Sequence, residues 1–243
     1  MKNNKIENAA TFYELKWDTD YFGVNCAKAI LYKSLTLVEW NNLKDRFKDF
    51  QFISIENRNS EPVNAQFIGK DTNAFLADVN IQFKKKLEVQ YKIMENISFH
   101  QAMKRDEHVV EIAEFQFSKF TEDPELAMRG GNQVYCQWLI NSFEKLGKYY
   151  ALSKNENGEV NGFLLHSYSD NACVVELIAV SKNSAYGGIG KNLFKALECV
   201  AYERGCNEIR VGTQVRNLGA INFYHKVGCK QVGCHQIYHL WNL

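Results

Sequence analysis

A glycine-rich turn between a predicted strand and a predicted helix is the segment of this sequence best suited to chemistry. The apolar run 174–180 leads into the sequence GGIGK at 187–191. Free backbone N–H groups and the positive end of a helix dipole both favour a bound anion. The segment therefore predicts a phosphate-binding turn, and a cofactor that carries a diphosphate is the first hypothesis.

Two well-known nucleotide-binding loops do not fit this turn. A Walker loop needs glycine five residues before Gly190 and a hydroxyl after Lys191, but Ala185 and Asn192 stand there. A dinucleotide fingerprint needs a further glycine three positions after Gly190, where Leu193 stands. The spacing thus argues against a Mg-nucleotide and against a nicotinamide dinucleotide.

Two motifs resemble those of the GNAT acyltransferases, which use acyl-CoA. The spacing Ala185-x-x-Gly188-x-Gly190 resembles the family pattern [QR]-x-x-G-x-[GA], with alanine at the first position. Backbone amides alone would then hold the pyrophosphate. The string TQVRNLGAINFYHKVGC at 213–229 resembles N-x-x-A-x-x-F-Y-x-x-x-G-F, with Cys229 in place of the aromatic residue. Two motifs in the family's order carry more weight than either one.

The resemblance implies a GNAT fold of the α/β (α+β) class, in which a mixed, mostly antiparallel and splayed sheet is flanked by helices. It also implies a donor, acetyl-CoA or a short-chain hydroxyacyl-CoA, whose pantetheine arm lies between the strands at 174–180 and 208–213. The donor-binding residues that it implies are Ile178, Val180, Tyr186, Gly187, Gly188, Ile189, Gly190, Lys191, Asn217 and Tyr224.

The residue pattern predicts the elements that position these groups. Apolar residues recur at helical spacing over Ile189–Ala201, and Gly205 stands where a C-terminal cap is expected. A strand at 208–213 and a helix at 217–228 follow, and the last strand spans 231–241.

A catalytic domain over 97–243 is predicted from the pattern upstream of the two motifs. A strand from Ile97, a cap at Asp106 and an amphipathic helix resemble the start of a GNAT domain. The segments 148–152 and 159–168 supply the next two strands.

Residues 1–90 are predicted to form a smaller α/β N-terminal domain that contributes to the acceptor pocket. It contains a helix around Leu37–Phe50, a strand at Phe52–Ile55 and an alternating strand at Ala74–Phe83. The lysines at 84–86 then read as a solvated charge run before the second domain.

Acid–base groups are harder to assign. Tyr224 matches the family tyrosine beside the departing sulfur. Donation from a tyrosine of pKa about 10 to a thiolate of pKa about 8.5 is uphill by roughly 2 kcal/mol, so a lowered pKa or a strong hydrogen bond must help. Glu176 is a candidate catalytic or water-holding acid, and an ion pair with an arginine explains it equally well. His166 is a further candidate, with a structural role as the alternative.

The N-terminal half adds a second resemblance. The segment WDTDYFGVN at 17–25 is similar to the opening of two-domain nucleotide-sugar acyltransferases such as the dTDP-fucosamine (dTDP-4-amino-4,6-dideoxygalactose) acetyltransferases of bacterial glycan synthesis, including O-antigen and other lipopolysaccharide pathways. The strings SKF at 118–120, YCQWLINS at 135–142 and RVGTQVRN at 210–217 extend this similarity. It implies acyl transfer to the amino group of a dTDP-linked 3- or 4-amino-dideoxyhexose by a homodimeric enzyme.

An acceptor of this kind needs cations for its diphosphate and flat surfaces for its rings. Each candidate side chain has a surface ion pair or a core position as its alternative, and the segment 120–134 is a candidate acceptor loop. The candidates are Trp17, Tyr21, Phe22, Arg129, Trp138, His166 and Arg216.

Composition excludes other classes of function. A net charge of +1 does not indicate the basic surface that is typical of nucleic-acid-binding proteins. No apolar stretch is long enough for a membrane span. The seven cysteines lack a CxxC pair, so a metal site and a cysteine nucleophile are not predicted, and their odd number favours a cytoplasmic location. Acetylation of another amine, such as a protein N-terminus or a small molecule, remains the main alternative. Acyl-CoA binding without catalysis is the second.

Overall fold

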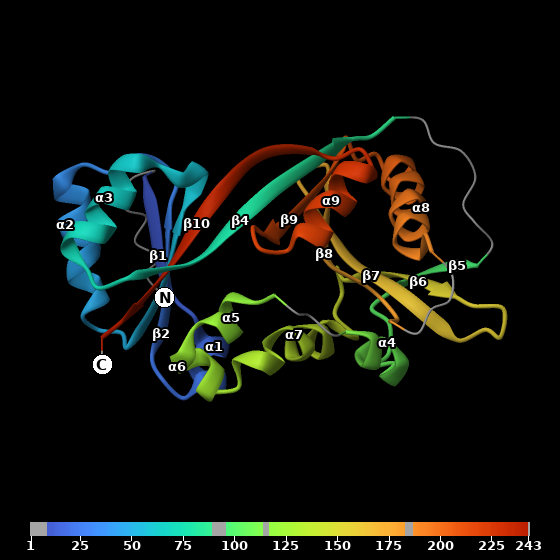
Figure 1. Ribbon diagram of the computed structural model, residues 1–243, viewed down its shortest axis with the longest axis horizontal. Helices are drawn as coiled ribbons and strands as arrows, with labels where there is room; N and C mark the ends of the chain where they lie inside the picture. Colours follow the sequence, from blue (N-terminus) through green and yellow to red (C-terminus); the bar gives the residue numbers. More distant parts are fainter. Residues whose placement is uncertain (1–8, 89–95, 114–116, 183–186, 243) are drawn as a thin grey trace. The chain divides into compact units, whose positions relative to one another are not determined.

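The computed structural model describes residues 9–88, 96–113, 117–182 and 187–242 (Figure 1). The chain forms two compact units. Unit 1 contains Met1–Ile81, Ser118–Asn132 and Gly233–Leu243, and unit 2 contains Gln82–Phe117 and Gln133–Val232. The boundary near residue 90 that the sequence indicates stays a prediction about domains, and the two units are described separately below. The predicted Tyr186 contact lies outside the described residues.

Unit 1 is built on four neighbouring strands in the order β1-β2-β3-β10. They are β1 (Ala10–Glu14), β2 (Cys26–Leu31), β3 (Phe52–Asn57) and β10 (Lys230–Trp241). The pair β1–β2 is antiparallel, β2–β3 is parallel and β3–β10 is antiparallel, so the sheet is mixed.

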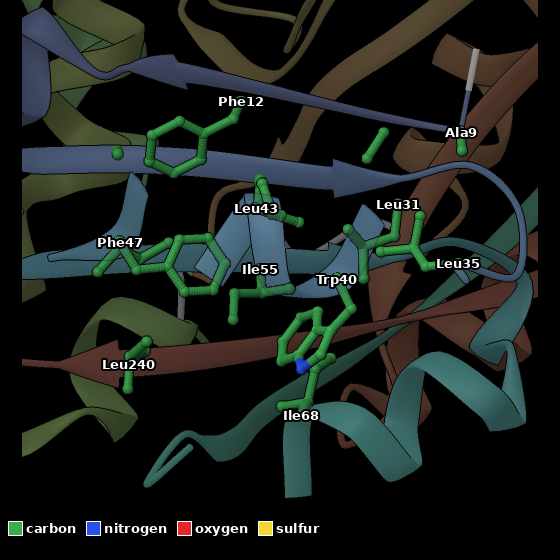
Figure 2. Packing of buried hydrophobic residues seen from close by; sticks show 14 residues of the cluster. Ala9, Phe12, Leu31, Leu35, Trp40, Leu43, Phe47, Ile55, Ile68 and Leu240 are labelled. Carbon is green, nitrogen blue, oxygen red and sulfur yellow. The ribbon is translucent and has the colours of Figure 1, made fainter. Parts of the chain in front are cut away.

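One face of this sheet buries an apolar core against two helices, α2 (Leu37–Phe47) and α3 (Pro62–Asp71). The α2 N-terminus has a capping box, because Thr36 accepts from the Glu39 N–H and the Glu39 carboxylate accepts from Thr36. Figure 2 shows the resulting packing of strand and helix side chains. The labelled members are Ala9, Phe12, Leu31, Leu35, Trp40, Leu43, Phe47, Ile55, Ile68 and Leu240.

Short helical segments make up the rest of unit 1. They are α1 (Lys16–Phe22), η1 (Arg58–Ser60), α5 (Lys119–Glu122), α6 (Pro124–Met128) and η2 (Gly131–Gln133). The predicted acceptor loop at 120–134 is therefore a run of capped helical turns. Gly130 has a φ of 92°, and a Cβ on Gly131 would lie 2.0 Å from the Phe120 carbonyl oxygen, so both positions require glycine.

Unit 2 contains the strand order β4-β9-β8-β7-β6-β5. Strands β5 to β8 pair antiparallel, whereas β8 and β9 pair parallel, as the predicted mixed sheet requires. The strands are β4 (Phe75–Lys86, whose first part belongs to unit 1), β5 (Ile97–Gln101), β6 (Tyr149–Lys154), β7 (Val160–Ser169), β8 (Ala172–Val180) and β9 (Glu208–Gln214).

Helices cover both faces of the unit 2 sheet. The helices α4 (Glu107–Ile112) and α7 (Val134–Ser142) pack on the face that includes Phe163. The neighbouring Gly162 faces the other way, where a Cβ would meet Ile189 at 2.8 Å, so α8 (Ile189–Glu203) covers the opposite face. The helix α9 (Leu218–Lys226) follows β9.

The predicted elements of the second half are confirmed to within a few residues, including the Asp106 cap and the left-handed Gly205 after α8. The lysine run at 84–86 continues β4 and is solvated only in part. Lys84 and Lys86 are accessible to solvent, whereas Lys85 donates to the Glu198 carboxylate and to the Val227 carbonyl, both at 2.6 Å. Because Glu198 is buried on α8, its charge needs this partner in the interior.

Candidate active site

The two central parallel strands of unit 2 separate part-way along their length. Pairing of β8 with β9 runs from Ala172–Glu208 to Val175–Val211, whereas the strands continue to Val180 and Gln214. Beyond Val175, the backbone N–H and C=O groups of the two strands do not pair with each other through hydrogen bonds. An extended chain with amide groups can pair with them. The position of a pantetheine arm beside Ile178 and Val180 stays a prediction.

A β-bulge lies at the start of this separation. Leu165 of β7 pairs with Leu177 and His166 pairs with Val175, so Glu176 is the extra residue on β8. A bulge redirects a side chain and is common beside active sites. Glu176 therefore occupies the position where β8 leaves β9.

Glu176 is held by a lysine and not by the predicted arginine. Both of its carboxylate oxygens lie 2.6 Å from Lys148 Nζ, and the Glu176 side chain is only 8% exposed. Burial raises the pKa of Tyr150 to about 12, and the nearby Glu176 charge adds to this rise. Tyr150 shares a 2.5 Å hydrogen bond with Ser142 of α7, so the ion pair lies near the face that α4 and α7 cover.

The glycine-rich turn opens α8 as predicted. Gly188 has a φ of 95° and precedes the first helical residue, Ile189, and a Cβ on Gly187 or Gly188 would meet nothing within 4 Å. The backbone here is thus accessible for a close approach. Gly190 is required for packing, since a Cβ there would lie 3.3 Å from the Phe223 ring. Lys191 lies in the first turn of α8, where a cation reinforces an anion site.

Tyr224 projects from α9 into an aromatic environment. Its ring packs against Phe83, Phe194 and Phe223, and the residue is 4% exposed. Its hydroxyl makes no hydrogen bond within the part of the chain that the structure describes, so the hydroxyl is available to a substrate atom. Burial, with a smaller contribution from Cys229, raises the pKa of Tyr224 well above its ordinary value.

Asn217 caps α9. Its Oδ1 accepts from the Ala220 N–H at 3.0 Å, which leaves the side-chain amide N–H groups for a ligand. At the free end of β9, Gln214 donates to the Tyr135 hydroxyl of α7 at 2.8 Å. Tyr135 stacks on Trp138, which is 41% exposed. Aromatic side chains of α7 thus line the same end of unit 2.

His166 is buried away from solvent. Its Nε2 lies 3.2 Å from the Tyr168 hydroxyl and its ring stacks on Tyr149. The Arg204 guanidinium lies over the rings of both Tyr149 and Tyr168, at 4.5 and 4.3 Å from their centroids. This environment matches the structural alternative for His166, and a role in acceptor binding stays a prediction.

We expect His166 to make unit 2 sensitive to acid. Burial lowers the pKa of His166 to about 4. In the unfolded chain the pKa is about 6.5. The unfolded state therefore binds more protons between these values, and stability falls as the pH drops from about 6.5 to about 4, by roughly 3 kcal/mol.

The measurement is chemical unfolding at a series of pH values. The variant H166Q should lose most of this pH dependence, whereas H108Q, at an exposed histidine of α4, should keep it. An unchanged acid slope in H166Q would contradict the assignment.

The other acceptor candidates lie in unit 1, except Arg216, which is in the exposed turn between β9 and α9. Trp17 is 39% exposed and stacks on Tyr21, whose hydroxyl donates to the Gly130 carbonyl at 2.9 Å. Phe22 is buried against Phe120. Arg129 is engaged by the Phe22 carbonyl, by Glu125 and by the Trp241 ring. Of the four candidates in unit 1, Trp17 therefore offers the most open surface.

Sequence reasoning missed two groups. Lys148 has no local signal, because its partner Glu176 is 28 residues away. Asp123 of unit 1 accepts hydrogen bonds from His239 at 2.7 Å and Trp241 at 3.0 Å, across more than 110 residues. The alternation of polar residues in the predicted strand 231–241 was the available signal for His239.

The described residues contain neither a metal-binding cluster nor a membrane-spanning helix. No group of three or more histidine, cysteine, aspartate or glutamate side chains there could hold a metal ion. Among the same residues, no helix is long and apolar enough to cross a membrane.

Comparison with known proteins decides the family. The model of the acetyltransferase (GNAT) family matches residues 105–229. The chain belongs to the GNAT family. The matched region contains the separated strands, the glycine-rich turn and Tyr224, and the members of this family use acyl-CoA as donor.

Individual relatives support the same fold. The chain is 27% identical over 137 residues to the spore coat polysaccharide biosynthesis protein SpsD of Bacillus subtilis. The aligned region covers 56% of this chain and 47% of SpsD. The chain thus spans about half the length of this curated relative. A GCN5-related N-acetyltransferase from Sphaerobacter thermophilus has a TM-score of 0.61 at 14% identity, over 96% of this chain and 76% of its own. A conserved protein of unknown function from Staphylococcus epidermidis has a TM-score of 0.63 at 12% identity, over 100% and 94%.

Proposed function

We propose that this GNAT protein transfers an acyl group from acyl-CoA to the amino group of a dTDP-linked 3- or 4-amino-dideoxyhexose. The acyl-transfer part of this proposal rests on one observation. Strands β8 and β9 separate part-way along their length, in the same unit as the glycine-rich turn and Tyr224. The similarity to SpsD, a polysaccharide biosynthesis protein, supports a sugar acceptor, together with the N-terminal sequence WDTDYFGVN.

The proposed reaction is a direct attack of the sugar amine on the thioester carbonyl. The new C–N bond forms, the C–S bond breaks, and the CoA thiolate leaves. The Tyr224 hydroxyl donates a hydrogen bond to the departing sulfur, because its raised pKa opposes complete proton loss. Glu176 receives the proton of the attacking amine.

Lys148 has a defined part in this proposal. Its ammonium contacts both oxygens of Glu176 and fixes the carboxylate at the bulge. Such bidentate contact restricts the rotamers of a base and keeps it aimed at the amine. Trp138 of unit 2 is proposed to stack on an acceptor ring, and Arg216 of the same unit to pair with acceptor charge.

We expect E176Q to lower kcat about 100-fold, the usual size of a lost general base. K148M should lower kcat less than E176Q does and leave the KM for acyl-CoA near that of wild type, because the Glu176 carboxylate loses the contact that fixes it. K148R should recover part of the rate. The control K154M removes the charge of an exposed lysine on β6. A kcat of K148M equal to that of wild type would contradict the positioning role.

The substrate assignment is tested with purified protein, acetyl-CoA and a panel of dTDP- and UDP-linked 3-amino and 4-amino dideoxyhexoses. Thiol release that depends on the sugar, with the matching gain in product mass, is the expected result. If no sugar in the panel causes thiol release with acetyl-CoA or with hydroxyacyl-CoA donors, the sugar assignment is wrong. Turnover with peptide N-termini or small amines instead would establish the alternative acceptor class. Light scattering of the same preparation measures whether the expected homodimer forms.

A further inference from the structure

One face of the unit 1 sheet carries a row of polar side chains. In the strand registers Tyr13 pairs with Lys28, Lys28 with Ser54, and Ser54 with His239. Residues paired in register project from the same face. This face is the one opposite the apolar core of Figure 2, because the neighbouring Ile55 and Leu240 belong to that core.

His239 presents an unused nitrogen on this face. Its Nδ1 lies 2.7 Å from the Asp123 carboxylate, which only accepts, so Nδ1 carries a proton. Burial lowers the pKa of His239, and Asp123 opposes that shift only in part, so the ring is neutral near pH 7. Its Nε2 is then a lone-pair acceptor, and it is buried with no hydrogen-bond partner among the described residues.

Ser54 presents a second unused group beside it. Its residue is 5% exposed, and its Oγ also has no partner within the described ranges. Native proteins leave few buried polar groups unpaired, and each one carries a desolvation penalty. Two such atoms on directly paired residues indicate a position that a hydrogen-bonding group from outside the chain completes.

Lys119 supplies a positive charge near this position, and its ammonium lies 5.1 Å from the centroid of the Phe120 ring. It begins α5 and is half-buried, and its ammonium has no salt bridge or hydrogen bond to a described residue. Burial and then Lys28 lower the pKa of Lys119 to about 8, and Lys119 in turn lowers the pKa of His239. Lys28 and His239 are the two register neighbours of Ser54. Lys119 also lies four residues before Asp123, whose carboxylate contacts His239, the register partner of Ser54.

Acidic groups near Lys119 offset part of the cost of its burial. They are Asp78, Glu56 and Asp18. Glu56 is also engaged by Lys28 at 2.7 Å and by Arg58 at 3.0 Å. An anionic ligand would add a direct partner for the Lys119 ammonium.

We infer that Ser54, His239 and Lys119 bind a phosphoryl oxyanion, with the Lys119 ammonium and the Ser54 hydroxyl as donors. His239 takes up a proton on binding and donates from Nε2, with the Asp123 carboxylate on the other side of its ring. The charged groups around the ring are Asp123 and Lys119, and its other neighbours are the rings of Phe52 and Phe75. The identity of the oxyanion as the diphosphate of a sugar nucleotide rests on the proposed function.

The test is isothermal titration calorimetry of the full chain with dTDP, inorganic pyrophosphate and thymidine. We expect dTDP and pyrophosphate to bind and thymidine to bind far more weakly. Titration in two buffers of different ionisation enthalpy should show proton uptake on binding. Failure of both dTDP and pyrophosphate to bind at millimolar concentration would overturn the site.

Variants assign the site to these residues. K119M should weaken dTDP binding at least tenfold, K119R should recover part of the affinity, and S54A should weaken it several-fold. The matched control K70M removes an exposed lysine of α3, which packs on the opposite face of the sheet, and should change nothing. If K119M and S54A fold and bind like wild type, the inference is wrong.

The binding result and the proposed activity can fail separately. Sugar acylation with a KM unaffected by K119M would retain the activity and overturn the site. Lys119-dependent binding of dTDP without acylation of any nucleotide sugar would retain the site and overturn the proposed substrate.

Discussion

Replacing Tyr224 with phenylalanine is expected to lower kcat about 100- to 1000-fold while leaving the KM for acyl-CoA within a few-fold of wild type. The ring contacts with Phe83, Phe194 and Phe223 remain in this variant, so only the hydroxyl is lost. Because the hydroxyl acts on the departing sulfur, its loss affects the transition state more than the ground state. Steady-state thiol release with saturating acceptor measures the effect.

The raised pKa of Tyr224 predicts how this hydroxyl works. The phenol stays protonated through the pH range in which the enzyme is folded and assayed, so Tyr224 gives no basic limb to the rate profile. The lowered pKa that would allow easy proton donation is thus absent, and a hydrogen bond to the sulfur remains. The control Y202F removes an exposed hydroxyl of α8 and should keep full activity. Near-normal turnover in folded Y224F would overturn the role.

Replacing Asp123 with alanine is expected to lower the free energy of unfolding by about 3–5 kcal/mol, the scale of a broken buried polar pair. Asp123 is fully buried and caps α6, accepting from the backbone N–H groups of Glu125 and Leu126 at 3.0 and 3.2 Å. Its other oxygen accepts from His239 and Trp241. The variant leaves all four donors without their acceptor. Chemical denaturation followed by tryptophan fluorescence measures the loss.

The same carboxylate predicts a pH dependence of stability. Burial tends to raise the pKa of Asp123, but the hydrogen bonds from His239 and Trp241 outweigh burial and hold the pKa below its ordinary value. The stabilisation is therefore present above the unfolded pKa of about 3.9 and is lost as the pH falls through the lower folded pKa. The control D45A removes an exposed aspartate of α2 and should leave the free energy of unfolding nearly unchanged. A comparable loss in D45A and D123A would contradict the argument.

The sequence by itself determined the family and most elements of unit 2. The glycine spacing at 188 and 190 and the string around Tyr224 lie in local segments, and their roles depend on backbone conformation that neighbouring residues decide. Apolar periodicity located α8 and β9 for the same reason. The lysine run at 84–86 indicated solvated side chains only in part, because a buried partner on α8 and not local composition decides where Lys85 lies.

Only the tertiary structure decided which polar groups meet. Glu176 is a strand residue by sequence, and the bulge opposite Leu165 and His166 together with the reach of Lys148 makes it a fixed carboxylate at the point where β8 leaves β9. Asp123 and His239 are 116 residues apart and meet because α6 packs against the face of β10. Contacts of this kind depend on strand register and on side-chain burial, which local sequence patterns do not encode.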